Sequence, residues 1–195
     1  MPYRLRPVPK QPTWKANEDD EKLYAMYDRL LDKIGPPEQL GRELLDEDTR
    51  WLAITHKSFD HGRRGFNDRL AFLGKRIVDL QTSLALLSMP SPPVSLPSDH
   101  VFRHPSLEGA DNITAFTKAQ VLDKRRLADL ARKFGIQRVI RWKPRRSDDL
   151  ETSGVDVVLA HTLYSIVGAL ALHKGGEVAA KTAREKILRP LGLRF

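Results

Sequence analysis

The feature of the sequence that most restricts the fold is an apolar segment near the C-terminal end, VVLAHTLYSIVGALAL, at residues 157–172. It is the longest apolar run of the chain, and it contains His161. A helix that crosses a membrane needs about 20 consecutive apolar residues, so this run is short for a span. The sequence therefore predicts a buried core helix at residues 152–173 and no membrane span.

The rest of the chain places apolar residues at the three- and four-residue spacing of amphipathic helices. Neither an internal repeat nor an alternation of strands and helices is visible, and this pattern favours an all-α fold. Asp48 is a candidate cap for one of the short helices. The further predicted helices cover residues 18–34, roughly 37–45, 49–58, 67–88, 112–134 and 176–188.

Composition divides the chain into three parts. Residues 1–17 are rich in proline and carry basic but no acidic side chains, which predicts an extended basic arm. Residues 18–44 form an acidic N-terminal helical segment, and residues 45–195 form the main domain, interrupted by a proline-rich loop at 89–111. The chain contains no cysteine, which excludes disulfides, thiolate metal sites and cysteine nucleophiles.

The formal net charge of +8 favours a polyanionic partner such as RNA. Basic runs are usually solvated surface, but two of them are better candidates for phosphate contacts. Trp142 lies within the second run and is expected to stack on unpaired bases. The predicted RNA-binding residues are Arg4, Arg6, Lys10 and Lys15 in the arm, and Arg138, Arg141, Lys143, Arg145 and Arg146 in the second run.

Four motifs follow one another in a specific order. They are THKSF at 55–59, NDRLAFLGKRIVDL at 67–80, LADLARKFGI at 127–136 and LAHTLYSIVGAL at 159–170. Together they resemble the ribonuclease III domain over residues 45 to 190, roughly. The resemblance implies an all-helical, dimeric domain of a kind that cleaves double-stranded RNA with magnesium held by carboxylates.

The carboxylates of that family map onto five positions, of which one is still acidic: Asp68, Ala71, Lys75, His161 and Tyr164. Lys75 places a positive charge where the cation would lie, and two unit charges about 4 Å apart repel by roughly 4 kcal/mol at an effective dielectric of 20. His161 beside Asp68 is a weak site for a transition metal, and a packed or hydrogen-bonded histidine is the alternative. We therefore expect no metal, no cofactor and no catalytic residue.

The resemblance also implies a dimer interface on the helix at 67–88. The residues expected there are Leu70, Phe72, Leu73 and Gly74. The alternative for Phe72 is that it fills the core of its own domain. His56 and Ser58 in the first motif are interpreted as structural hydrogen-bonding groups.

The chain ends at Phe195, soon after the last predicted helix, so a C-terminal double-stranded-RNA-binding domain is not expected. In this the sequence resembles the ribonuclease III-like proteins of the mitochondrial large ribosomal subunit, notably those of fungi. That resemblance implies a structural protein of the mitochondrial matrix that binds ribosomal RNA and other ribosomal proteins and pairs with a second ribonuclease III-like protein. Two alternatives stay open: an endoribonuclease that borrows carboxylates from its partner, and a non-ribosomal scaffold of RNA processing.

Overall fold

A computed structural model describes residues 14–90, 104–107 and 109–195. The described residues contain no β-strand, and one isolated bridge joins Thr55 to Arg141. The predicted all-α fold is therefore confirmed. The α-helices are α1 (Asp20–Leu30), α2 (Glu47–Ala53), α3 (Asp68–Leu87), α4 (Ala115–Val121), α5 (Lys124–Phe134), α6 (Val155–Lys174) and α7 (Gly176–Thr182), the last of which continues as a π-helical turn, Ala183–Leu188.

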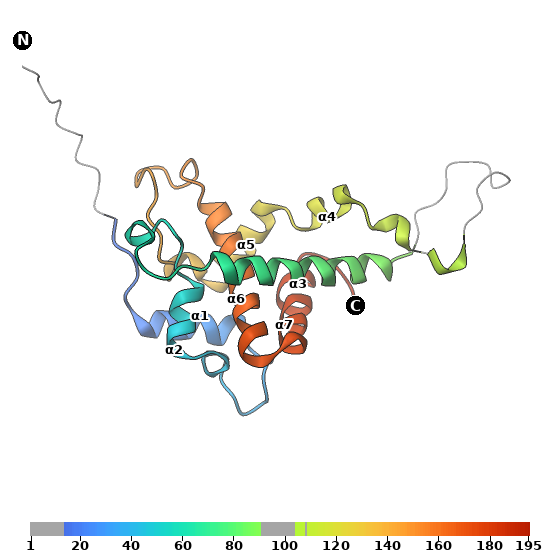
Figure 1. Cartoon of the computed structure of the whole chain (residues 1–195), viewed down its shortest axis with the longest axis horizontal. Coiled ribbons are helices and arrows are strands. Elements are labelled where there is room, and N and C mark those ends of the chain that lie inside the picture. The colour runs from blue at the N-terminus through green and yellow to red at the C-terminus, as the bar shows by residue number, and fades with distance from the viewer. Residues whose placement is uncertain (1–13, 91–103, 108) are drawn as a thin grey trace, which may run out of the picture.

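Helix α6 is the centre of the fold (Figure 1), and it packs against α3, α5 and α7. By length and composition it could cross a membrane, but most of its residues are buried inside the protein. Its position confirms the core helix predicted from the apolar run. A hydrogen bond also ties it to the end of α2, because Ser165 donates from Oγ to the carbonyl of Ala53 at 2.7 Å.

Helices α3 and α6 touch through their backbones. A Cβ atom added to Gly74 would lie 1.8 Å from the carbonyl oxygen of Tyr164, so only glycine fits there. Leu70, one turn earlier on α3, is also buried. Leu70 and Gly74 were both expected at a dimer interface, and this part of the prediction is wrong because both face α6 of their own chain.

The predicted helices before α3 are shorter in the structure. The segment predicted as a helix at 37–45 contains only a 3-10 turn, Gly41–Leu44. Gly41 packs so closely that an added Cβ would lie 2.5 Å from the carbonyl oxygen of Tyr27 in α1. Helix α2 is capped by Asp46, which accepts from the backbone N–H of Thr49, rather than by Asp48 as expected.

The helix predicted at 112–134 is two helices in the structure, α4 and α5. Helix α4 ends at Val121, and Asp123 caps the start of α5 by accepting from the backbone N–H groups of Arg125 and Arg126. Helix α5 ends at Gly135, whose φ of 87° lies in the left-handed region that glycine favours. Much of the loop predicted at 89–111 lies outside the described residues.

The N-terminal segment, from Trp14 onward, is docked on the domain. The indole Nε1 of Trp14 donates to the carbonyl of Trp142 at 2.7 Å, and the two rings meet edge to face with centroids 5.7 Å apart. Arg141 Nε donates to the carbonyl of Asn17 at 3.2 Å. Residues 14–17 therefore lie against the segment that follows α5, whereas residues 1–13 of the predicted arm lie outside the described residues.

Candidate functional site

A cleft of about 340 Å³ lies over the exposed side of α3 and α6, where α4 gives way to α5. Its polar side chains come from four helices: Lys75 and Asp79 from α3, Lys118 from α4, Lys124 from α5, and His161 and Tyr164 from α6. The apolar part of the wall is formed by Ala119, Leu122, Leu127, Val157 and Ala160. Three of the five positions that the resemblance assigns to metal-binding acids, Lys75, His161 and Tyr164, therefore line one cleft.

Asp68, the one acid that remains of the five, is held by basic partners. Its Oδ1 accepts a hydrogen bond from His161 Nε2 at 3.0 Å, and its Oδ2 lies 3.6 Å from Lys57 Nζ. The structure thus places His161 as the hydrogen-bonded histidine of the two alternatives. A carboxylate already shared by two basic groups is a poor ligand for a divalent cation, which needs several oxygen ligands.

The other mapped positions offer no ligand for magnesium. Ala71 has no side-chain oxygen and is only 2% exposed. The phenol of Tyr164 is neutral at neutral pH, and burial, with a further contribution from Asp79, raises its pKa further, to about 12. Within the described ranges, no group of three or more His, Asp or Glu residues could hold a metal ion. The side chains at these positions therefore do not fit a magnesium ion held by carboxylates, which the resemblance to ribonuclease III implies.

His56 packs beside the cleft, with its ring centroid 6.1 Å from that of His161. Its Nδ1 accepts from the backbone N–H of Ser58 at 3.2 Å, and the Ser58 hydroxyl accepts from the backbone N–H of Lys143 at 2.9 Å. Burial is the main cause that lowers the pKa of His56, and the neighbouring His161 and Lys57 add to it. This geometry supports a structural role for His56 and Ser58.

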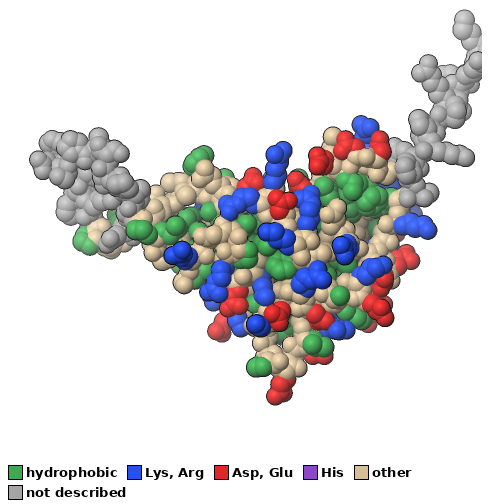
Figure 2. Space-filling view, turned by 180° about the vertical axis from the view of Figure 1, so that it is seen from behind, with side chains coloured by type: hydrophobic (Ala, Val, Ile, Leu, Met, Phe, Trp, Pro, Cys, Tyr) green, Lys and Arg blue, Asp and Glu red, His purple; other side chains and the backbone are tan. Residues whose placement is uncertain are grey.

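The predicted RNA-binding residues fall into two groups in the structure. Lys15, Arg138, Lys143, Arg145 and Arg146 are exposed, although Arg146 also pairs with Asp148 at 3.1 Å. Figure 2 shows lysine and arginine side chains spread across the middle of one face of the molecule. Arg4, Arg6 and Lys10 lie outside the described residues.

Within the second basic run, the prediction that Trp142 stacks on bases is wrong, and Arg141 is partly engaged inside the protein. The guanidinium of Arg141 lies 3.5 Å from the ring centroid of Trp51, and desolvation lowers its pKa. Its Nε donor, which binds the carbonyl of Asn17, and one face of its guanidinium are therefore engaged inside the protein. Trp142 is only 3% exposed, so its ring cannot stack on an RNA base. Periodicity in such a short segment gave no signal of these tertiary contacts.

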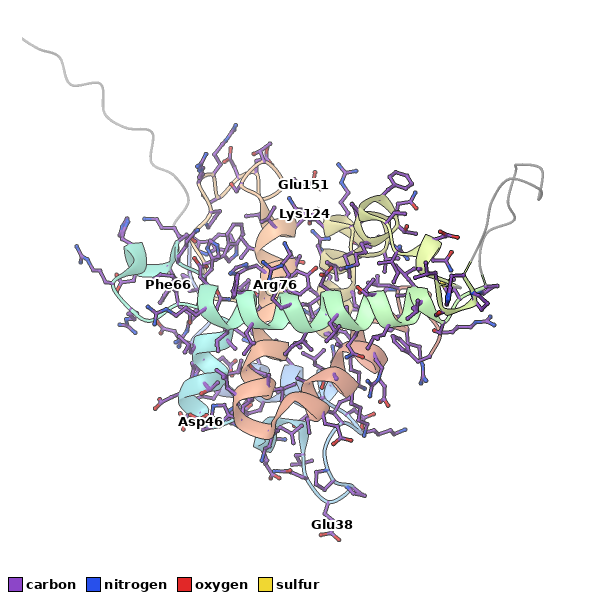
Figure 3. The ribbon with its side chains drawn as sticks, turned by 45° about the vertical axis from the view of Figure 1, so that its right-hand side comes forward. Glu38, Asp46, Phe66, Arg76, Lys124 and Glu151 are labelled. Atoms are coloured by element: carbon purple, nitrogen blue, oxygen red, sulfur yellow. The ribbon has the colours of Figure 1, made fainter. Side chains whose placement is uncertain are left out.

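The exposed side of α3 carries a line of apolar side chains, which we call the α3 apolar stripe: Phe72, Leu80, Leu84 and Leu87. Phe72 is 66% exposed, so the alternative that it fills its own core is wrong. The guanidinium of Arg76, labelled in Figure 3, lies 5.1 Å from the centroid of the Phe72 ring. Sequence analysis did not name Leu80, Leu84 and Leu87 at the interface, although they lie four and three residues apart, about one helical turn each, which is a detectable signal.

The comparisons with known proteins agree on one family. A family model described as ribonuclease-III-like matches residues 46–191. Over 187 residues the chain is 44% identical to the large ribosomal subunit protein mL57 of Neurospora crassa, covering 94% of this chain and 68% of that protein. It is 33% identical over 167 residues to ribonuclease 3 of Mycolicibacterium paratuberculosis, covering 84% of this chain but 59% of the enzyme.

A solved structure shows the same fold. The nuclease domain of ribonuclease III from Campylobacter jejuni superposes with a TM-score of 0.59 at 20% identity and covers 92% of this chain and 100% of that domain. With the family model spanning most of the chain, the order of the four motifs and the all-helical architecture have a common explanation. The chain belongs to the ribonuclease III-like family.

Proposed function

We propose that this chain is a structural protein of the large subunit of the mitochondrial ribosome and that it binds ribosomal RNA through a non-catalytic ribonuclease III-like domain. The observation that carries the proposal is the 44% identity, over 94% of the chain, to a protein named as part of a large ribosomal subunit. The mitochondrial matrix is the proposed location, in line with the fungal mitochondrial proteins that the sequence resembles.

We propose that the chain is not a catalyst because of the residues at the five positions that map onto metal-binding acids. Asp68 is engaged by His161 and Lys57, Ala71 is buried and carries no oxygen, and Lys75 is exposed with its positive charge in the cleft. An enzyme of this type needs several carboxylates around its cations. A degenerate endoribonuclease would have to obtain nearly a whole metal site from a partner, so we do not favour that alternative.

The proposed RNA contacts use the exposed basic side chains. Lys143 and Arg145 are exposed and follow Trp142, on which Trp14 is docked, so we include these two residues in the proposed RNA interface. Such contacts to phosphates give affinity without sequence specificity. Arg141 is left out of the proposed interface because its guanidinium is committed to Trp51 and to the carbonyl of Asn17.

The proposed protein partner is a second ribonuclease III-like protein that covers the α3 apolar stripe. Four large apolar side chains on one exposed helix face are a typical mark of an interaction surface. Two copies of this chain would bring two copies of Lys75 into the same assembly, so an unlike partner of the same fold is favoured. Leu73, which is partly exposed between Phe72 and the core, is expected at the edge of this interface.

Co-sedimentation tests the proposal. The tagged chain, expressed in its own cells, should migrate with large ribosomal subunits on a sucrose gradient of mitochondrial lysate. It should stay with them after magnesium is lowered to separate the subunits and after a moderate salt wash. Migration at the top of the gradient, or with a smaller RNA-containing complex, would favour the non-ribosomal scaffold instead.

A further inference from the structure

The cleft on α3 and α6 is basic although its family counterpart holds cations. Three lysines line it, and only Lys118 has an acidic partner, since its Nζ lies 3.3 Å from Asp79 Oδ2. Lys75 and Lys124 are exposed and form no ion pair with any residue that the structure describes. Apart from Asp79, which pairs with Lys118, the cleft therefore carries positive charge that no described residue neutralises.

Tyr164 gives a second and independent indication. Its side chain is 92% buried, because its relative exposure is 8%, and it lines the cleft. Its hydroxyl makes no hydrogen bond to any described residue, yet it is not among the buried polar atoms sealed from solvent. Buried hydroxyl groups usually have a partner. Because Tyr164 lines the basic cleft and its hydroxyl is not sealed from solvent, this hydroxyl is an available donor for an anion.

The remaining wall of the cleft is apolar. Leu122, Leu127, Val157 and Ala160 face the same space as the lysines. The volume of about 340 Å³ falls at the lower end of the range for small-ligand pockets, roughly 300–1,000 Å³. The space is thus suited to one compact ligand with an anionic end and a flat or apolar body.

We propose that this cleft binds a single nucleotide unit, with its phosphate held by Lys75, Lys124 and the Tyr164 hydroxyl and its base or sugar against the apolar wall. Ammonium and hydroxyl donors recognise phosphate oxygens by charge-assisted hydrogen bonds. No metal ion takes part, because the lysines supply the charge. Figure 3 labels Lys124 at the start of α5, on the side of α3 where α4 and α5 lie.

The same chemistry has two possible sources, a free mononucleotide or a terminal or unpaired nucleotide of an RNA chain. Either source fits the donors equally, and the experiment distinguishes them. The proposal does not depend on membership of the ribosome, because it is tested on the isolated chain.

Calorimetric titration of the full chain at low salt, in the presence of EDTA, tests the proposal. The probes are AMP, UMP and adenosine, together with a short unpaired RNA carrying either a 5′-phosphate or a 5′-hydroxyl. AMP and UMP should bind, and adenosine should bind at least about tenfold more weakly because it lacks the phosphate, a difference worth about 1.4 kcal/mol. A preference for the phosphorylated RNA, with displacement of AMP by it, would assign the site to an RNA chain; binding of AMP without displacement would assign it to a free nucleotide.

Matched variants locate the site. The double variant Lys75→Gln/Lys124→Gln should weaken binding of AMP at least about tenfold, and Tyr164→Phe should weaken it several-fold with an unchanged melting temperature. Lys133→Gln, an exposed lysine on the same helix α5 but outside the cleft, should have no effect. The proposal is overturned if AMP does not bind, if adenosine binds equally well, or if the double variant and Lys133→Gln behave alike.

Discussion

Gly74 of α3 and Gly168 of α6 face each other where the two helices cross. A Cβ atom on Gly74 would lie 2.7 Å from the backbone nitrogen of Gly168, and a Cβ atom on Gly168 would lie 3.0 Å from that of Gly74. Both distances are shorter than ordinary van der Waals contact. The close approach of α3 to α6 therefore depends on two missing side chains, one from each helix.

This contact predicts a large effect of one methyl group. Gly74→Ala should lower the free energy of unfolding by roughly 3 kcal/mol, at the upper end of overpacking effects, because the added Cβ meets backbone that cannot move away. Gly176→Ala, at the start of α7, is the control: nothing lies within 4 Å of the added Cβ. That variant should be neutral or slightly stabilising. Urea unfolding of both variants would show whether the two glycines differ as expected.

If the α3 apolar stripe is the interface with the partner protein, a charge placed on it should prevent binding. Phe72→Asp should abolish binding to a ribonuclease III-like partner, because an unpaired carboxylate buried in an interface costs several kcal/mol. Leu172→Asp changes a side chain that is 67% exposed near the end of α6, on a different helix from the stripe, and it should leave pairing intact. Sedimentation velocity of each variant with the partner measures the difference. Pairing of the Phe72 variant at unchanged affinity would remove α3 from the interface.

The exposed basic residues predict salt-dependent RNA binding. If the arm and the second basic run together contact about six phosphates, log K should fall against log salt with a slope of roughly −4 to −5. Lys143→Ala/Arg145→Ala should reduce the magnitude of that slope by about 1.5 to 2.

Arg141→Ala provides the contrast for that experiment. Since Arg141 contacts Trp51 and Asn17, its loss should lower the melting temperature and leave the slope of the remaining folded protein unchanged. A slope that falls by the same amount in both variants would mean that Arg141 does reach the RNA.

The cleft predicts that the purified chain does not cleave double-stranded RNA with magnesium. Single-turnover assays with excess protein, with and without Mg²⁺, provide the measurement. Any cleavage that copurifies should persist in Asp68→Ala, which would identify it as contamination. Metal-dependent cleavage that disappears in Asp68→Ala would show that the domain is an active nuclease.

His56 predicts a loss of stability in acid. In the folded protein the pKa of His56 is lowered below 6.5, chiefly by burial. At a pH between the folded pKa and the unfolded pKa of about 6.5, the unfolded chain therefore binds more protons than the folded protein. The free energy of unfolding should therefore fall as the pH drops below about 6.5. His56→Gln should be less sensitive than the wild type to a change from pH 7.5 to 5.5 in urea unfolding. Equal sensitivity of the two proteins would exclude His56 as the group responsible.

The long helices could be predicted from the sequence because their patterns are long. The expected helices at 67–88 and 152–173 correspond to α3 (Asp68–Leu87) and α6 (Val155–Lys174) with ends displaced by at most three residues. The break between α4 and α5 was missed, although Asp123 is a good capping residue, because apolar spacing continues across it. Capping chemistry marks the boundary there, whereas periodicity does not.

The sequence indicated which side-chain types occupy the site, but not the tertiary contacts around it. Side-chain types alone showed that Ala71 and Lys75 cannot bind magnesium. In contrast, the burial of Trp142 and the stacking of Arg141 depend on Trp14 and Trp51, which are far away in the sequence. The orientation of Gly74 toward α6 rather than toward a partner depends in the same way on a contact between distant segments.

The central position of α6 also affects the order in which the molecule can form. Translation proceeds from the N-terminus, so α1, α2 and α3 are complete before the first residue of α6, Val155, has been added. Until α6 emerges, α3 lacks the helix against which most of its contacts are made, and contacts between distant segments form slowly. We therefore expect the domain to fold in one late step after synthesis rather than helix by helix. If so, the apolar residues of α6 and α3 stay accessible to solvent until synthesis is complete.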